Sequence, residues 1–436
     1  MSEWKYLKIQ DLVDTKKYSC VGGPFGSNLI SEDYIDTPGV PVIRGNNFVL
    51  GSQYFYDEGF VFVSDKKADS LFQNTAYQGD VVFTQRGTIG NVALIPKNTK
   101  FSKYVLSQNL MKLSVDPEKA DPRFICYYFL SPRVQETITR NSIGSTIPGF
   151  NLTQLRNFPV LLPSLKEQTK IADVLSCLDR KISNLRQQNE TLEAIAQTLF
   201  KHWFVDFEFP NEDGKPYRSS GGEMVRSELG EIPAGWKVGK LGDFCDVKHG
   251  YAFKGEFITT EETDQILLTP GNFRIGGGFN SSKYKYYSNY DYDEDYVLAP
   301  DDLVINMTDL SKEGDTLGYP AFVPKHSKNV FLHNQRLGKI VDSQIDLFFL
   351  FFLLCRREYR SHILGTASGS TVRHTSPSRI LECEFIVPSM ELLENFSSTA
   401  NNLIRKSFLN HAQIETLNRT RDVLLSKLIS GQLRID

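Results

Sequence analysis

The chain has 436 residues, with 49 Lys and Arg against 52 Asp and Glu, a formal net charge of −3 and 40% hydrophobic residues. Since domains usually hold about 100 to 200 residues, this length predicts two or three of them, and the apolar content excludes general disorder. The near-zero charge argues against a protein that coats nucleic acid by electrostatics alone, but it leaves room for local basic surfaces.

No segment predicts a membrane span or a secreted protein. The longest apolar run, residues 347–355, is nine residues long, whereas a helix needs about 20 to cross a bilayer. The N-terminal MSEWKYLKIQ lacks the apolar stretch of a signal peptide, so we expect a cytoplasmic protein without membrane contact. The six cysteines form no CxxC pair, which argues against a zinc site or a disulfide framework.

Residues 1–162 predict a domain of mixed α and β structure. Short β-rich runs at 40–43, 80–83 and 92–95 are separated by Gly, Asn and Pro turns. The run 124–130 is apolar nearly all round, so periodicity does not distinguish a buried helix from a buried strand there.

Residues 163–205 predict a long helix, because apolar side chains recur at spacings of four and three, as in the seam of a coiled coil. The seam consists of Ile171, Leu175, Leu178, Ile182, Leu185, Asn189, Leu192, Ala196 and Leu199. The run exceeds 30 residues without Pro or Gly and gives a rod of roughly 45 to 50 Å. Such a rod is not stable alone in water, so it must pack against a partner.

A linker at 206–235, rich in Gly, Pro, Ser and charge, precedes a second copy of the same pattern. At a constant shift of 225, Phe124 matches Phe349, and Gly144-Ser145-Thr146 matches Gly369-Ser370-Thr371. Residues 236–387 therefore predict a second mixed domain, with a β-rich run at 303–305 and an ambiguous apolar run at 347–354. Residues 388–436 predict the second helix, whose seam consists of Phe396, Ala400, Leu403, Ser407, Asn410, Ile414, Leu417, Arg421, Leu424 and Leu428.

The duplication predicts the architecture. Two matching helices on one chain, with a globular part between them, most simply pair antiparallel, and Asn189 and Asn410 would help to fix their register. The alternative is that both stripes face ordinary bundle cores. We predict an α+β chain of two tandem mixed α/β domains, joined by two long helices that form an antiparallel coiled coil with pseudo-twofold symmetry.

A search for catalytic motifs finds none. The Gly-Lys dipeptides at Gly214, Gly239 and Gly338 are never followed by Ser or Thr, so no phosphate-binding Walker loop is present. HExxH, GxSxG, GxGxxG and the Asn-Pro-Pro-aromatic motif of amino-methyltransferases are missing, and Pro300-Asp301 lacks the acidic-x-Lys half of a nuclease centre. The sequence thus predicts a chain that is not an enzyme, with a degenerate enzyme as one alternative.

Polar residues suited to nucleic acid are present but dispersed over probable loops and strand ends, including the loop after Gly22. Arg reads guanine bidentately, Asn and Gln read adenine, and Lys, Ser and Thr hold phosphates. The alternative for any one cluster is ordinary surface polarity. The DNA-binding candidates are Arg44, Asn46, Asn47, Arg86, Thr88, Gln108, Asn109, Arg274, Lys283, Lys285, Asn334, Arg336 and Arg373.

Four segments in combination resemble a known family. They are LPSLKEQ at 162–168, NETLEAIAQTLFKHWFVDFEFP at 189–210, SELGEIPAGW at 227–236 and LLSKLISGQLRID at 424–436. Together they resemble the DNA specificity subunit of type I restriction-modification systems, and the resemblance covers essentially the whole chain. One departure is Leu393, which stands where the family has Gln, so the second helix is expected to dock differently at its start.

The resemblance implies two target-recognition domains, at 1–162 and 236–387, each reading one half of a split, asymmetric sequence in double-stranded DNA. It implies conserved coiled-coil helices at 163–205 and 388–436, and no catalytic centre, metal or cofactor on this chain. S-adenosylmethionine, ATP and Mg²⁺ are expected on the partners, which are two modification (methyltransferase) subunits and the restriction subunits. The alternative is a standalone two-headed DNA-binding or scaffold protein without a methyltransferase partner.

Overall fold

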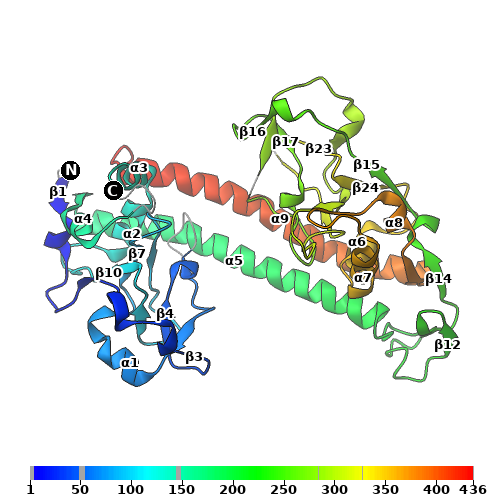
Figure 1. Ribbon diagram of the computed structural model, residues 1–436, viewed down its shortest axis with the longest axis horizontal. Helices are drawn as coiled ribbons and strands as arrows, with labels where there is room; N and C mark the ends of the chain where they lie inside the picture. Colours follow the sequence, from blue (N-terminus) through cyan, green and yellow to red (C-terminus); the bar gives the residue numbers. More distant parts are fainter. Residues whose placement is uncertain (1–3, 49–54, 144–148, 283, 327, 436) are drawn as a thin grey trace. The chain divides into compact units, whose positions relative to one another are not determined.

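The computed structural model describes residues 4–48, 55–143, 149–282, 284–326 and 328–435 (Figure 1). The chain forms two compact units. The first unit comprises residues 1–184 and 414–436, and the second comprises residues 185–413. Within the described ranges, no helix has the length and apolar character needed to cross a membrane.

The first unit is built on a four-stranded sheet, a five-stranded sheet and a two-stranded ribbon. Their strand orders are β2-β10-β7-β8, β3-β5-β4-β9-β6 and β1-β11. All pairings are antiparallel except β4 with β9, which is parallel. The strands are β1 Lys5–Lys8, β2 Cys20–Gly22, β3 Tyr34–Ile35, β4 Val40–Ile43, β5 Val61–Val63, β6 Thr75–Ala76, β7 Val81–Thr84, β8 Val92–Leu94, β9 Tyr104–Leu106, β10 Leu110–Leu113 and β11 Pro159–Leu162.

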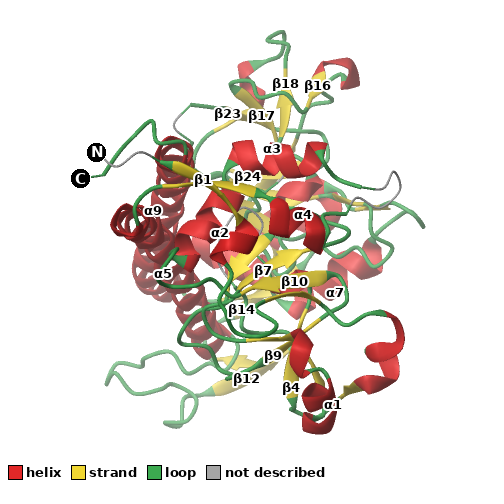
Figure 2. Ribbon diagram, turned by 90° about the vertical axis from the view of Figure 1, so that its left-hand side faces the viewer, coloured by secondary structure: helices red, strands yellow, loops and turns green. Residues whose placement is uncertain are grey.

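Four short helices complete the body of the first unit: α1 Asp65–Ser70, α2 Pro122–Leu130, α3 Pro132–Arg140 and α4 Leu152–Asn157. The ambiguous apolar run is a helix, because the Asp121 side chain caps its first turn by accepting from the Arg123 amide. Helix α2 packs on β7 and β8 and buries most of its side chains there (Figure 2).

The second unit repeats this framework strand by strand. Its sheets have the orders β15-β24-β20-β22, β16-β18-β17-β23-β19 and β14-β26, and only β17 with β23 is parallel. The elements are β14 Lys237–Lys240, β15 Asp246–His249, β16 Ile258–Thr259, β17 Gln265–Leu267, β18 Lys285–Tyr287, β19 Val297–Leu298, β20 Leu303–Asn306, β22 Pro320–Phe322, β23 Val330–Leu332, β24 Leu337–Val341, α6 Leu347–Leu354, α7 Arg357–Thr366, α8 Pro377–Leu381 and β26 Glu384–Val387. The predicted duplication is confirmed, although Gly144-Ser145-Thr146 lies outside the described residues.

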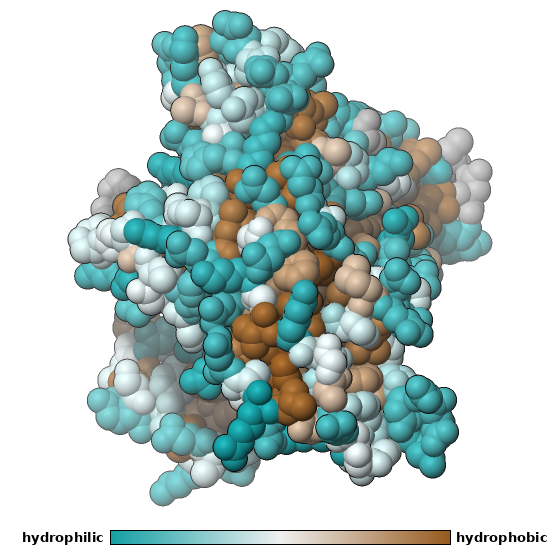
Figure 3. All heavy atoms as spheres, turned by 90° about the vertical axis from the view of Figure 1, so that its right-hand side faces the viewer, coloured by the Kyte–Doolittle hydropathy of each residue, from teal (hydrophilic) through white to brown (hydrophobic). Residues whose placement is uncertain are grey.

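Helix α6 resolves the second ambiguous run. Asp346 accepts from the backbone amides of Phe348 and Phe349, at 2.9 and 3.3 Å, and so caps the helix. Its Leu and Phe side chains fill the main core of the second unit. Some apolar side chains remain at the surface in the middle of the face that this unit presents in Figure 3, bordered by hydrophilic ones.

The two long helices are α5 Leu165–Phe204 and α9 Met390–Ile429. In the first unit Asp179 of α5 meets Arg421 of α9, and in the second unit Asn189 meets Asn410. The residue numbers of the contacts decrease along α9 as they increase along α5, so the helices pair antiparallel (Figure 1). Every predicted seam position is buried or half-buried, which confirms the coiled-coil seam.

Leu393 departs from the family pattern and is docked differently from its counterpart Gln168. Gln168 is buried, and its amide accepts from the Asp121 backbone at 3.0 Å and donates to the Pro163 carbonyl at 3.1 Å. Leu393 has no such groups and lies in the apolar core of the second unit. The two helix starts are therefore held by hydrogen bonds in one unit and by apolar packing in the other.

The segment predicted as a linker is folded. It contains the hairpin of β12 Met224–Ser227 and β13 Gly230–Pro233. Outside this segment, the second unit has a further pair of short strands, β21 Thr308–Asp309 with β25 Arg373–His374. Phe209 stacks on Tyr217 and Trp236, with ring centroids 4.6 and 5.2 Å apart. The Gly, Pro and Ser content of the segment predicted a flexible linker, whereas its aromatic side chains pack against the core of the second unit.

Candidate nucleic-acid interface

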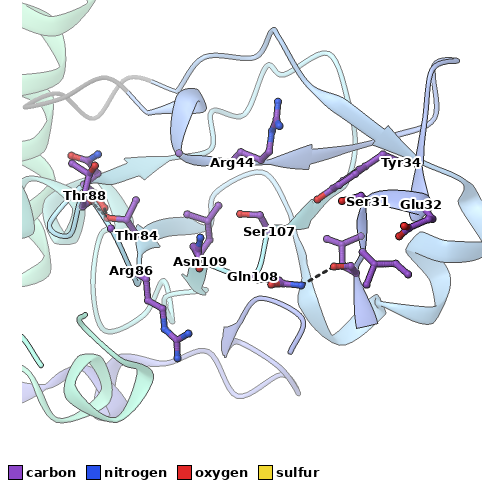
Figure 4. Close-up of a pocket in the computed structure, with 16 residues that line it drawn as sticks. Ser31, Glu32, Tyr34, Arg44, Thr84, Arg86, Thr88, Ser107, Gln108 and Asn109 are labelled. Atoms are coloured by element: carbon purple, nitrogen blue, oxygen red, sulfur yellow. Dashed lines mark hydrogen bonds between the residues drawn. The ribbon is translucent and has the colours of Figure 1, made fainter. Parts of the chain in front are cut away.

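A polar hollow of about 720 Å³ lies at the carboxyl ends of β4, β7 and β9 in the first unit (Figure 4). Because β4 and β9 are parallel neighbours, they end at the same edge of their sheet, which brings Arg44 beside Ser107. We call this feature the strand-end hollow. Its lining is Leu29, Ile30, Ser31, Glu32, Tyr34, Arg44, Gly45, Thr84, Arg86, Gly87, Thr88, Asn91, Ser107, Gln108, Asn109 and Leu110.

Two arginines predicted from the sequence contribute the positive charge of the hollow. In the close-up, the guanidinium groups of Arg44 and Arg86 extend in opposite directions, and Ser107 and Asn109 lie between them (Figure 4). Arg86 is exposed and Arg44 half-buried, and the buried Nε of Arg44 has no hydrogen-bond partner. Neither guanidinium forms an ion pair among the described residues, so their N–H donors remain available to a ligand such as a guanine edge or a phosphate.

Other predicted residues of the hollow shape its walls. The Gln108 amide donates to the carbonyls of Gly26 and Leu29, at 2.8 and 2.7 Å, and thereby fixes the loop that borders the hollow. The Thr84 hydroxyl donates to the Thr88 carbonyl at 2.7 Å and holds the turn that follows β7. Asn109 is exposed, and its side chain faces the hollow.

The adjacent candidates Asn46 and Asn47 have different surroundings. Asn47 is fully buried, where its amide donates to the Tyr56 and Glu58 carbonyls and its oxygen accepts from the Arg44 amide at 2.9 Å. Asn46 is exposed on the same turn. Asn47 therefore positions the Arg44 backbone, and only Asn46 presents its side chain to solvent.

The matching edge of the second unit has different chemistry. Thr269 occupies the place of Arg44, since it follows β17 and is held by buried Asn272 as Arg44 is held by Asn47. Asn334 is nearly buried, and its oxygen accepts from the Arg336 amide at 2.9 Å, while the Arg336 side chain is exposed. We call Thr269, Thr308, Asp309, Asn334 and Arg336 the strand-end surface of the second unit.

Asp309 organises the loop at this surface, and sequence reasoning missed it. Its carboxylate accepts from the Ser311 amide at 2.8 Å and from both the amide and the hydroxyl of Thr316. Burial raises the pKa of Asp309, but these hydrogen bonds outweigh burial and hold the pKa below its ordinary value. The Asp309-to-Thr316 spacing has no motif that would reveal such a loop in the sequence.

The buried histidine at this edge is neutral. Burial lowers the pKa of His333 to about 4, and its Nε2 lies 3.0 Å from the Leu337 carbonyl. A neutral ring that donates from Nε2 leaves Nδ1 as an acceptor, and that atom has no partner. His333 thus supports the strand ends and adds no charge to the surface.

The remaining candidates are scattered. Arg274 lies close enough to the long helices for its charge to act on Glu193 and His411. Burial has the larger effect and raises the pKa of Glu193 but lowers the pKa of His411, whereas the charge of Arg274 lowers both. Lys285 is exposed on β18, and the Arg373 Nε donates to the Lys312 carbonyl at 3.1 Å. Lys283 lies outside the described residues. Nowhere in the described ranges do three His, Cys, Asp or Glu side chains form a group that could hold a metal ion.

Comparison with known proteins adds sequence relatives to this geometry. Residues 1–194 and 233–419 match the family model described as the type I restriction modification DNA specificity domain. The chain is 28% identical over 442 residues to the type I restriction enzyme MjaIX specificity subunit of Methanocaldococcus jannaschii, covering 100% of this chain and 94% of that protein. It is 24% identical to the HindI specificity subunit of Haemophilus influenzae, covering 96% and 100%.

A solved structure shares the fold. The crystal structure of the type I restriction-modification system S subunit from M. genitalium matches with a TM-score of 0.57 and 16% identity, covering 98% of this chain and 96% of that chain. At this identity, the match supports the arrangement of strands and helices and does not extend to individual side chains.

Proposed function

The chain belongs to the family of type I restriction-modification DNA specificity subunits, and from that premise we propose that it reads a bipartite, asymmetric target in double-stranded DNA. Each unit reads one half of the target with the loops at its strand ends. The specificity subunit is the non-catalytic component of a type I system.

One observation carries this proposal: the two units share a strand framework but differ in the side chains at the same edge. In the first unit, Arg44 and the exposed Arg86 lie at this edge. In the second unit, Thr269 and the buried Thr308 take their places, and the exposed arginine of the edge is Arg336. Arginine donors suit the acceptors of guanine, so edges that present their arginines at different places suit different base sequences. Equivalent edges with different donors and acceptors favour two different half-targets.

The low net charge of −3 fits a subunit that specifies sequence within an assembly, since partners supply part of the phosphate contacts. The partners we propose are two modification subunits, which bind S-adenosylmethionine and methylate adenine, and restriction subunits, which use ATP and Mg²⁺. The repeated framework supports two equivalent docking surfaces for the modification subunits.

The test is to express the chain with the modification subunit encoded beside its gene and to map methylated adenines over a host genome. We expect methylation at one bipartite sequence with two unrelated halves and a fixed gap. Methylation that is absent, or that depends on a single continuous sequence, would overturn the proposal. Sequence-specific binding by the isolated chain without methylation in the complex would favour a standalone DNA-binding protein.

A further inference from the structure

Phe25, on the loop that the Gln108 amide ties to the strand-end hollow, has an exposure that its surroundings do not explain. Its side chain is 86% exposed, more than any other large hydrophobic side chain among the described residues. Its neighbours Pro24 and Leu29 are both buried, so the backbone on either side is packed against the unit while the ring faces water.

The turn that carries Phe25 is held firmly. It is a 3-10 turn, Gly26–Asn28, with Phe25 at its start. The Gln108 amide bonds to the carbonyls of Gly26 and Leu29. A Cβ at Gly23 would lie 1.9 Å from the Ser107 carbonyl oxygen, so the backbone that leads into the turn lies directly against the end of β9. A ring on such a turn loses little conformational entropy when it binds.

The second unit lacks this turn. Gly23 and Gly250 are equivalent, since each donates its amide to the first residue of the neighbouring strand, Leu110 or Leu337. From that glycine to the first strand of the five-stranded sheet there are eleven positions in the first unit, ending at Tyr34, and eight in the second, ending at Ile258. The first unit therefore contains a three-residue extension at this place.

The aromatic residues of the shorter loop are less exposed. Phe253 is 7% exposed and packs edge-on against Tyr287, with ring centroids 4.9 Å apart. Tyr251, directly after the shared glycine, is 39% exposed and packs against Phe253 and Tyr296. In the first unit, the extension carries Phe25 on a loop that the Gln108 amide ties to the strand-end hollow.

We propose that Phe25 inserts between neighbouring bases at the edge of the half-target that the first unit reads. This inference rests on the proposed function. An isolated apolar ring fits a base step, where such side chains unstack the bases and kink the duplex. The buried core of a protein interface is more apolar than the rest of the surface, whereas the residues that follow Phe25 are exposed Gly26, Ser27 and Asn28.

Insertion acts together with the hydrogen-bonding groups of the hollow. Arg86 and Asn109 contact base edges, and Phe25 opens the adjoining step, so that the deformability of that step contributes to specificity. The half-target read by the first unit should therefore prefer a flexible step at one flank. The second unit, whose loop has no aromatic side chain as exposed as Phe25, should not show this preference.

The experiment uses the complex of the chain with its modification subunits and a duplex carrying the mapped target. 2-Aminopurine is placed in turn at each position of the first unit's half-target and its flanks, except the methylated adenine, because a methyltransferase itself flips its target base out of the stack. We expect fluorescence to rise severalfold at one position with the wild-type complex and to stay low with Phe25→Ala. We also expect Phe25→Ala to weaken DNA binding about tenfold and Phe25→Trp to restore it.

The matched control is Phe72→Ala, which removes a 55% exposed phenylalanine that packs edge-on against Tyr18. It should leave both signals unchanged. If the wild-type complex binds its target but Phe25→Ala changes neither fluorescence nor affinity, base insertion is wrong while the proposed function stands. If Phe25→Ala weakens assembly with the modification subunits in the absence of DNA, the ring is a protein contact and the inference is also wrong. A wild-type complex with no bipartite target overturns both proposals.

Discussion

The strand ends of the two units show which parts of a duplicated fold are free to diverge. The loop between β7 and β8 is shorter than its counterpart between β20 and β22: Val92 follows Thr84 by eight positions, and Pro320 follows Asn306 by fourteen. The loop that carries Phe25 differs in the opposite direction. Since the strands bury their side chains and the loops do not, insertions are tolerated at the strand ends without loss of the core.

The long helices show a second contrast. In the first unit, the Asp179 carboxylate accepts from the Arg421 guanidinium at 3.0 Å and from the Tyr127 hydroxyl at 2.7 Å. In the second unit, the two helices are joined by a neutral hydrogen bond of 2.9 Å between Asn410 and Asn189. The positions that match Arg421 and Asp179 at the shift of 225 are Ala196 and Ile404, which are part of the apolar core. The charged contact of the first unit is thus not repeated in the second, where the polar contact along the seam is between amides.

The largest expected effect comes from exchanging residues 5–162 for those of another specificity subunit. If each unit reads its own half-target, one half of the methylated sequence changes completely while the other half and the gap stay the same. The design keeps Trp4, because the Arg434 guanidinium lies over its ring at 5.2 Å and also bonds to Glu167. Methylation mapping checks the outcome, and a change in both halves would contradict independent reading.

The charged contact on the helices should be more costly to remove than the neutral one. Asp179→Ala leaves Arg421 and the Tyr127 hydroxyl without their shared acceptor, and we expect a loss of about 2 to 3 kcal/mol in the free energy of unfolding. Asn410→Ala should cost about 1 to 2 kcal/mol, because it leaves only a neutral amide unpaired.

Urea denaturation followed by circular dichroism measures both variants. The control is Asp422→Ala, which removes the more exposed partner of Arg421 and should cost well under 1 kcal/mol. Equal losses for Asp179→Ala and Asn410→Ala would show that the charged and the neutral contact of the seam contribute alike.

Much of the fold was predictable, because the long helices and the duplication leave regular signals. The seam spacing identified the helix partners, and the constant shift of 225 paired α2 with α6. Periodicity failed where every side chain is apolar, as in α6, since neither face of the run is polar. It also failed for residues 206–236, where composition suggested a spacer and Phe209 and Trp236 instead stack.

The site was less predictable, because the hollow joins residues that are distant in sequence. Arg44, Arg86 and Asn109 were chosen for their side chains, and only the parallel pairing of β4 with β9 and the neighbouring β7 brings them together. Asn47 has the same side chain as Asn46 but points inward. Such differences depend on the backbone direction at each turn, which residue type does not encode.

Arg86→Ala tests the chemistry of the strand-end hollow. If its guanidinium reads a base edge, the loss should be about 1 to 2 kcal/mol, which is roughly 10-fold or slightly more in binding, and recognition should relax at one base pair. Arg86→Lys should not restore selectivity, because lysine lacks the planar pair of donors.

Methylation rates on a set of single-base target variants report both effects for Arg86. The control is Arg140→Ala, which removes an exposed arginine of the same unit that pairs with Glu136. Uniform weakening across all target variants would assign Arg86 to a phosphate contact. The comparison between units is sharpened by Arg336→Ala, which removes the exposed arginine at the matching edge of the second unit and should affect only the other half-target.

The smallest expected effect concerns Asp309 and depends on pH. Its pKa is lowered in the folded protein, so its carboxylate adds stability that is present above the unfolded pKa of about 4 and is lost as pH falls through the lower folded value. Asp309→Asn replaces one acceptor oxygen with an amide that faces the donors of Ser311 or Thr316, and should cost about 1 kcal/mol at pH 7.

As the pH falls from about 4 through the lower folded pKa of Asp309, the wild-type carboxylate becomes protonated, and the difference in unfolding free energy between wild type and Asp309→Asn should shrink. Urea midpoints of both proteins between pH 7 and pH 3 measure this convergence. Glu313→Gln, in the same loop, provides a control without such hydrogen bonds. A difference that stays constant with pH would mean that the shape of the Asp309 side chain, and not its charge, holds the loop of the second unit.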